Sequence, residues 1–416
     1  MTAPSRLSRN RDYTLLWCGR AASEFGVSTT TIAFPLLVLA ITGSAAGAGL
    51  VLGAIGLAQL LAGLPAGALV DRWNRKRIML GCEAAQAAAA GSVVAAVLLH
   101  RVTVVQLIAV AAVIGVCAAL FDPAEDASLP ALVTAEQVPT AVAMNAARTS
   151  LGHLSGTSAG GFLFAAGRFV PFAAEAATHL AALAALPFVR LPPRPARTDH
   201  PGHLGRDIAE GLSWVWRQRP IRVTALCAVT LNLFFTAFYL IVIVRARARG
   251  VPAGEIGVMA AMLGAGGLLG SLAAPWLSRR LSPHAAIAGV FWILTALMPV
   301  ATVIGSGYLM GALFLVMALL PPTANTTIVS EQLLLTPDAK RGRMSSVIGL
   351  LTGVAGAAGP MLGGVATQLF GGQAAVLACA AGIAVVTVFA TLSPSLRQFP
   401  ARDQAEEIPE IPLGTN

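Results

Sequence analysis

Glu24 is the ionisable residue whose position most clearly suggests chemistry, because it lies inside a long apolar stretch of the sequence. A charged side chain in the middle of a bilayer is costly, so such a residue is a functional candidate by default. If this stretch enters a bilayer near Leu15, Glu24 lies about nine residues further on, or ~14 Å deep at 1.5 Å per residue, close to the midplane. A poorly solvated carboxyl at that depth can load and release a proton. The alternative is a structural glutamate paired with an arginine.

Arg148 is the obvious partner for a buried acidic residue. Its candidate partners are Glu24 and three acidic residues at the end of an earlier apolar stretch, Asp122, Glu125 and Asp126. Glu331, and Glu175 with His179, are weaker candidates for proton chemistry, and for each of them a structural role is the favoured interpretation. We expect proton coupling to involve Glu24, Arg148 and Glu331.

Four further residues are candidates for a substrate cavity. Asn232, Phe235 and Tyr239 are spaced at i, i+3 and i+7, so they share one face of a helix. Asn325 follows a Pro-Pro pair that should interrupt its helix and free backbone carbonyls. Packing is the alternative for such an aromatic face.

The composition places all these residues in a membrane protein. Of 416 residues, 56% are hydrophobic and 11% are charged, and the mean hydropathy is +0.75, whereas soluble domains carry roughly 25% charged residues. Windows long enough to cross a ~30 Å hydrocarbon core span residues 14–41, 47–70, 78–99, 103–121, 141–165, 169–190, 221–244, 254–276, 285–304, 307–332, 344–369 and 373–393. The sequence therefore predicts an all-α membrane protein of twelve transmembrane helices.

Other classes of protein fit the sequence poorly. The net charge of +9 does not indicate nucleic-acid binding, because the basic residues form short clusters between the apolar windows. The five cysteines have neither metal nor disulfide spacing. The hydrolase motifs HExxH and GxSxG and the nucleotide-binding GxxxxGK motif do not occur. We expect a monomer with no enzyme activity, metal or cofactor, whose partners are the lipid bilayer, a small-molecule substrate and protons.

The chain divides into two halves of six helices. We assign residues 1–190 to the first bundle, 191–220 to a linker, 221–395 to the second bundle and 396–416 to a disordered tail. The linker is Pro-rich and then amphipathic through Leu204, Ile208, Leu212 and Val215. With both termini in the cytoplasm of a bacterial cell, all but five of the 28 Lys and Arg residues fall on the cytoplasmic side of the cell membrane.

Two motifs carry a family resemblance. The loop after the second window reads GALVDRWNRKRI and resembles the signature of the major facilitator superfamily, with matches at Gly67, Asp71, Arg72, Arg75 and Lys76. Asn74 stands where the family has Gly, and asparagine tolerates a left-handed turn. In that family the aspartate lies near a neighbouring helix end and the basic residues hold the cytoplasmic gate.

The second motif occurs once in each half. GTSAGG at 156–161 aligns with GPMLGG at 359–364, and both resemble the fifth-helix motif of facilitator exporters, whose residues let helices bend and approach closely. The matching residues are Gly156, Gly160 and Gly161 in the first copy, and Gly359, Pro360, Gly363 and Gly364 in the second. Thr157 replaces the proline that the family prefers, and generic small-residue packing is the alternative.

The resemblance extends over nearly the whole chain, which is similar to the drug:proton antiporter branch that includes enterobactin and macrolide exporters. It implies two pseudo-symmetric six-helix bundles and proton-coupled export of small amphipathic molecules, such as an antibiotic, drug or siderophore, by alternating access. An importer or uniporter of the same fold is the alternative, and the membrane component of an ATP-driven pump is a weaker one.

Membrane topology can be tested in a cysteine-free background with single cysteines at Ser8 and at Gly254. Twelve crossings with a cytoplasmic N-terminus place these two positions on opposite sides of the membrane. An impermeant maleimide added to intact cells should label Gly254→Cys and spare Ser8→Cys. Labelling of both from the same side would contradict the topology.

Overall fold

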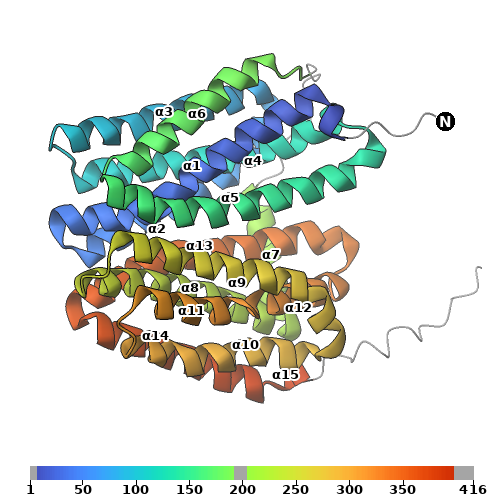
Figure 1. The fold of residues 1–416 in the computed structure, drawn as a ribbon. Helices are drawn as coiled ribbons and strands as arrows, with labels where there is room; N and C mark the ends of the chain where they lie inside the picture. Colours follow the sequence, from blue (N-terminus) through green and yellow to red (C-terminus); the bar gives the residue numbers. More distant parts are fainter. Residues whose placement is uncertain (1–6, 192–203, 398–416) are drawn as a thin grey trace, which may run out of the picture.

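The computed structural model describes residues 7–191 and 204–397, and within these ranges the chain is helical with no strand. The first half contains α1 to α6, with bounds Arg11–Thr42, Ala45–Arg72, Arg75–Leu98, Val104–Leu132, Val138–Ala166 and Val170–Ala185. The second half contains α8 to α14, with bounds Arg219–Ala248, Ala253–Arg280, Pro283–Leu297, Gly307–Ala318, Pro321–Leu334, Asp338–Phe370 and Gly372–Leu392. Figure 1 shows the first half (blue to green) stacked on the second (yellow to red).

Eleven helical segments of the described chain are long and apolar enough to cross a membrane. Helix α5 has 29 residues, also enough for a crossing, but its many Ser, Thr and Gly residues and the charged Arg148 lower its hydropathy. Helices α11 and α12 together form one span, Gly307–Leu334. The expected interruption is present, because Pro321 and Pro322 begin α12 after the two-residue break that ends α11.

The linker contains the expected amphipathic helix, α7, over Leu204–Arg217. Val215 is buried against Ile221 of α8 and Met344 and Val347 of α13. The side chains of Leu204 and Ile208 lie outside the described part, as do the tail residues 398–416. Leu396, which the sequence assigns to the tail, lies in the short helix α15, Pro394–Arg397, and is fully buried in the core.

Two differences from the expected boundaries bear on the site. Helix α4 continues to Leu132 rather than ending near residue 121, so its acidic residues lie within the helix. Arg20, which the sequence places among the cytoplasmic charges, lies inside α1 with its side chain 11% exposed. Charges at the ends of apolar windows mislead because a helix can continue through them when they pair with one another.

The halves touch each other through two equivalent helix pairs, α2 with α13 and α5 with α9. We call the end of the molecule where α1 begins and α14 ends the terminal end, and the opposite end the distal end. The close contacts lie in the distal parts of these helices, where Gly49 meets Pro360 and Gly364, and Gly161 meets Gly257. Nearer the terminal end, Leu64 of α2 and Ser346 of α13 line a cavity between the halves instead.

The two glycine motifs occupy equivalent places. Gly156 and Gly160 face α1, whereas Gly359 and Gly363 face α8, the corresponding first helix of the second half. A Cβ on Gly161 would lie 2.5 Å from the carbonyl oxygen of Ala253, and one on Gly364 would lie 2.5 Å from that of Ala45. In each copy, therefore, the first two glycines allow close packing against a helix of the same half, and the last glycine allows close packing against a helix of the other half.

Adding a methyl group at this contact should open the distal end. For Gly364→Ala the new Cβ meets the backbone of α2, which cannot yield, and such overpacking costs about 1–3 kcal/mol. Spin labels at Arg101 and Val303, exposed on distal loops of opposite halves, should report a longer or broader distance distribution. Gly342→Ala is the matched control on α13, because nothing lies within 4 Å of its Cβ. Unchanged distances in Gly364→Ala would contradict the contact.

Candidate functional site

Two adjoining cavities lie between the helices. The larger, about 760 Å³, is lined by α2 and α4 of the first half and by α8 and α13 of the second. The other, about 570 Å³, reaches into the first half between α1, α4 and α5. Gln59, Ala118 and Asp122 line both, so the two cavities form one central space.

Glu24 lies on the wall of this space and is held by two arginines. Its Oε1 is 3.2 Å from Nη2 of Arg148 and 3.3 Å from Nε of Arg20, which lies one turn earlier on α1. Nε of Arg148 donates to Oε2 at 3.2 Å, and the Thr149 hydroxyl donates to Oε1 at 3.2 Å. In this conformation Glu24 is therefore an ion-paired glutamate. Arg148, the partner that the sequence suggested, is one of its two arginines.

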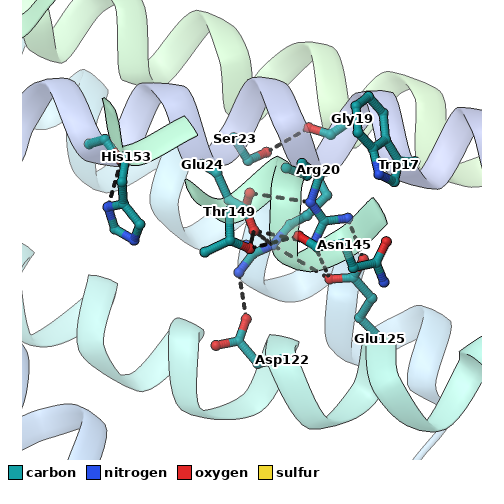
Figure 2. A network of polar contacts seen from close by, with 12 residues as sticks. Trp17, Gly19, Arg20, Ser23, Glu24, Asp122, Glu125, Asn145, Thr149 and His153 are labelled. Atoms are coloured by element: carbon teal, nitrogen blue, oxygen red, sulfur yellow. Dashed lines mark hydrogen bonds and ion pairs between the residues drawn. The ribbon is translucent and has the colours of Figure 1, made fainter. Parts of the chain in front are cut away.

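The same arginines also hold two acidic residues of α4. Arg148 donates to both oxygens of Glu125, with Nη1 at 2.6 Å and Nη2 at 3.0 Å. Arg20 reaches Asp122 at 2.5 Å and stacks over the Phe121 ring, 4.3 Å from its centroid. Figure 2 shows Arg20, Glu24, Asp122 and Glu125 converging on one point between the helices. We call Arg20, Glu24, Asp122, Glu125 and Arg148 the charge cluster.

The charge cluster contains two guanidinium groups and three carboxyl groups. Arg148, Glu125 and Glu24 are nearly inaccessible, with side chains 4%, 7% and 11% exposed, whereas the Asp122 side chain is 51% exposed to the cavity. Because arginine stays protonated, one carboxyl has no guanidinium to balance it. A proton or a cationic group in the cavity can balance it.

Arg20 and Glu83 are the residues that the sequence analysis missed. Arg20 lies four positions before Glu24, a spacing that brings two side chains together on a helix. Glu83 is 1% exposed, and its position inside the third apolar window is the same signal that marks Glu24 in the sequence. Asp126 was considered and lines the smaller cavity.

The other expected site residues are spread over the molecule. Asn232 lines the larger cavity. Tyr239 packs against Phe314, with ring centroids 5.8 Å apart, and Phe235 also packs against the core. Asn325 is exposed on α12, and Glu331 is buried on the same helix in the second half, away from the charge cluster. The structure therefore brings Glu24 and Arg148 together but does not bring Glu331 to them.

The loop signature links four helices at the terminal end. Arg75 donates to the Ala127 carbonyl of α4 at 2.5 Å, and Lys76 donates to the carbonyls of Pro187 and Val189, after α6, at 2.7 and 2.8 Å. Gly67, Asp71 and Arg72 are exposed at the end of α2. Asn74 is not in a left-handed turn. Its φ is −68°, and its side chain caps α3 by accepting from the Arg77 amide.

Within residues 7–191 and 204–397, no group of three or more His, Cys, Asp or Glu residues is placed to hold a metal ion. The carboxyl groups of the charge cluster can bind a proton or a cationic group.

Known proteins resemble this chain over almost its full length. Residues 3–413 match the family described as transmembrane secretion effector (MFS_3). The multidrug efflux pump Tap of Mycobacterium tuberculosis is 28% identical over 404 residues, covering 93% of this chain and 94% of that protein. Tap of Mycolicibacterium fortuitum is 28% identical over 393 residues, covering 90% and 93%.

Solved transporters share the fold. A bacterial homologue of the human lysosomal transporter Spinster, inward-facing and unoccupied, superposes with a TM-score of 0.74 at 15% identity, covering 94% of this chain and 98% of that one. The nucleoside transporter NupG gives 0.73 at 11% identity, covering 94% and 100%. Together with the family match, they make this chain a multi-pass membrane transporter and not an enzyme. The chain belongs to the transmembrane secretion effector family of major facilitator transporters.

Proposed function

We propose that this transporter is a proton-coupled exporter of small amphipathic molecules that works by alternating access in a bacterial cell membrane. The observation that carries the proposal is the charge cluster, in which three carboxyl groups share two guanidinium groups on the wall of the central cavity. The relatedness to multidrug efflux pumps supports the direction of transport.

Competition for the unbalanced carboxyl supplies a coupling mechanism. Protonation of Glu24 weakens the ion pairs that Glu24 makes with Arg20 and Arg148. A cationic or polar substrate group at Asp122 instead favours the ionised form of the cluster's carboxyl groups. Proton and substrate then bind in alternation, which is what exchange requires. The second half adds an apolar wall of small residues on α13, against which the rest of an amphipathic molecule can lie.

The close distal contacts, and a cavity between the halves that reaches Leu64 of α2 and Ser346 of α13, support a conformation open at the terminal end. With both termini in the cytoplasm, this is the state that loads substrate from inside the cell. The opposite, outward-open state then forms when two glycine contacts separate, Gly49 with Gly364 and Gly161 with Gly257.

Glu24→Gln should abolish uphill transport, because it resembles the protonated carboxyl in shape but cannot titrate. We expect proton-driven dye transport in proteoliposomes to fall by about tenfold or more while substrate exchange down its own gradient survives. Glu255→Gln is the matched control, since Glu255 accepts from the Gly307 amide at the distal end, far from the cavity. A panel of fluorescent amphipathic dyes identifies the test substrate first.

Full uphill transport by Glu24→Gln under a pH gradient would remove Glu24 as the proton carrier. Wild-type transport that ignores the pH gradient altogether would instead favour an importer or uniporter of the same fold.

Asp71→Asn should slow the cycle without weakening substrate binding, because Asp71 is exposed at the terminal end of α2 and does not line either cavity. We expect turnover to fall by about tenfold and the dissociation constant of the chosen dye to stay within about threefold. Initial rates in vesicles and fluorescence titration of purified protein measure the two quantities. A large loss of binding with normal turnover would contradict a gating role.

A further inference from the structure

A second group of titratable side chains lies behind α1, away from the cavity wall. Nδ1 of His179 on α6 is 2.6 Å from Oε2 of Glu83 on α3, and the Ser23 hydroxyl of α1 lies 3.0 Å from both Glu83 oxygens. Nε2 of His179 faces Oε1 of Glu175 across 4.0 Å, one turn away on α6. His179 and Glu175 are fully buried, and Glu83 is 1% exposed.

Several polar atoms of this group lack a hydrogen-bond partner in the part of the chain that the structure describes. They are both carboxyl oxygens of Glu175 and Nε2 of His179. The Thr30 hydroxyl of α1 lies beside Glu175 but donates to the Val27 carbonyl. An ionised carboxylate with so little support from donors is costly inside a membrane protein, which favours the protonated form of Glu175. Glu83 accepts from the Ser23 hydroxyl and lies within hydrogen-bond distance of Nδ1 of His179, so it has the donors that an ionised carboxylate needs.

We propose that Glu175, His179 and Glu83 form a proton-binding site that holds one transferable proton. With Nδ1 donating to Glu83, Nε2 is an acceptor aimed at the protonated Glu175. Transfer of the Glu175 proton to Nε2, with release of the Nδ1 proton to Glu83, moves one proton between the carboxyl groups and leaves the imidazole neutral. The site is complete without Glu24.

Helix α1 connects this site to the charge cluster. Ser23, whose hydroxyl stabilises ionised Glu83, is the neighbour of Glu24 in the chain. Other titratable groups on the neighbouring helices have partners or positions of their own. Arg20, Glu24, Asp122, Glu125 and Arg148 pair within the charge cluster, Asp126 lines the smaller cavity, His153 is hydrogen-bonded to Ser28, and Cys82 and Cys117 are buried. Movement of α1 that withdraws Ser23 therefore shifts the proton from Glu175 toward Glu83. Use of this shift in transport rests on the proposed proton coupling, whereas the bound proton itself does not.

Infrared spectroscopy of the purified full-length protein at neutral pH tests the site directly. A buried protonated carboxyl gives a carbonyl-stretch band separate from carboxylate and amide bands. We expect the wild type to show such a band, Glu175→Gln to lose it, and Glu24→Gln and Glu255→Gln to keep it; a proton on the charge cluster would give a separate band that Glu175→Gln retains. A Glu175→Gln spectrum that retains every carboxyl band of the wild type, or a wild type without such a band, would overturn the proposal.

Two further variants keep the test decisive if Glu175→Gln does not fold. His179→Gln changes what Glu175 faces and should shift the band. Ser23→Ala removes the donor that favours ionised Glu83, so the shared proton should move toward Glu83. The Glu175 band should then lose intensity to a second carboxyl band, which disappears when Glu83→Gln is added. Ser271→Ala is the matched control, because the Ser271 hydroxyl donates to the Gly267 carbonyl of its own helix in the other half of the molecule. A spectrum unchanged by His179→Gln, or by Ser23→Ala, would show that Glu175, His179 and Glu83 do not share a proton. Transport that ignores a pH gradient would overturn the proposed function and leave these bands in place.

Discussion

The pairing of two arginines with three carboxyl groups inside the first bundle is the constraint on which the rest of the structure depends. A charge buried among apolar helices must find a partner, and Arg148 meets this need for α1 and α4 together through Glu24 and Glu125. Removing one partner of such a buried pair leaves an uncompensated charge that costs about 3–5 kcal/mol. The cluster therefore fixes how α1, α4 and α5 lie against one another, and at the same time supplies the titratable group.

The two halves share a fold but not a chemistry. In the first half, polar groups converge on α1 from α3, α4, α5 and α6, through the charge cluster and the Glu83–His179 pair. The second half contributes Asn232 and small apolar residues of α13 to the cavity. In the function that we propose, this asymmetry gives proton binding to the first bundle and contact with the apolar part of the substrate to the second.

The glycine motifs show how the two bundles can separate without losing their internal packing. Gly156 and Gly160 allow α1 to pack closely within the first bundle, whereas Gly161 allows close packing against α9 of the second bundle. The contact between the halves is made mainly by two helix pairs, α2 with α13 and α5 with α9, whose closest approaches involve glycines in their distal parts. Small residues permit close approach without side-chain interlocking. Such a contact suits the alternating access that we propose.

The sequence by itself determined the membrane class, the number of crossings and the equivalence of the halves, because these follow from apolar windows, charge clusters and repeated glycines that are local along the chain. It also identified Arg148 as the partner of a buried carboxyl. Only the tertiary structure decided which side chains meet. Arg20 resembles a surface charge until α4 is seen to continue past Asp122, and Glu331, a candidate for proton coupling in the sequence, lies on α12 in the other bundle, away from Glu24. Such contacts join helices more than 100 residues apart, as for Arg20 with Asp122, and depth in the membrane alone does not specify which helix lies opposite.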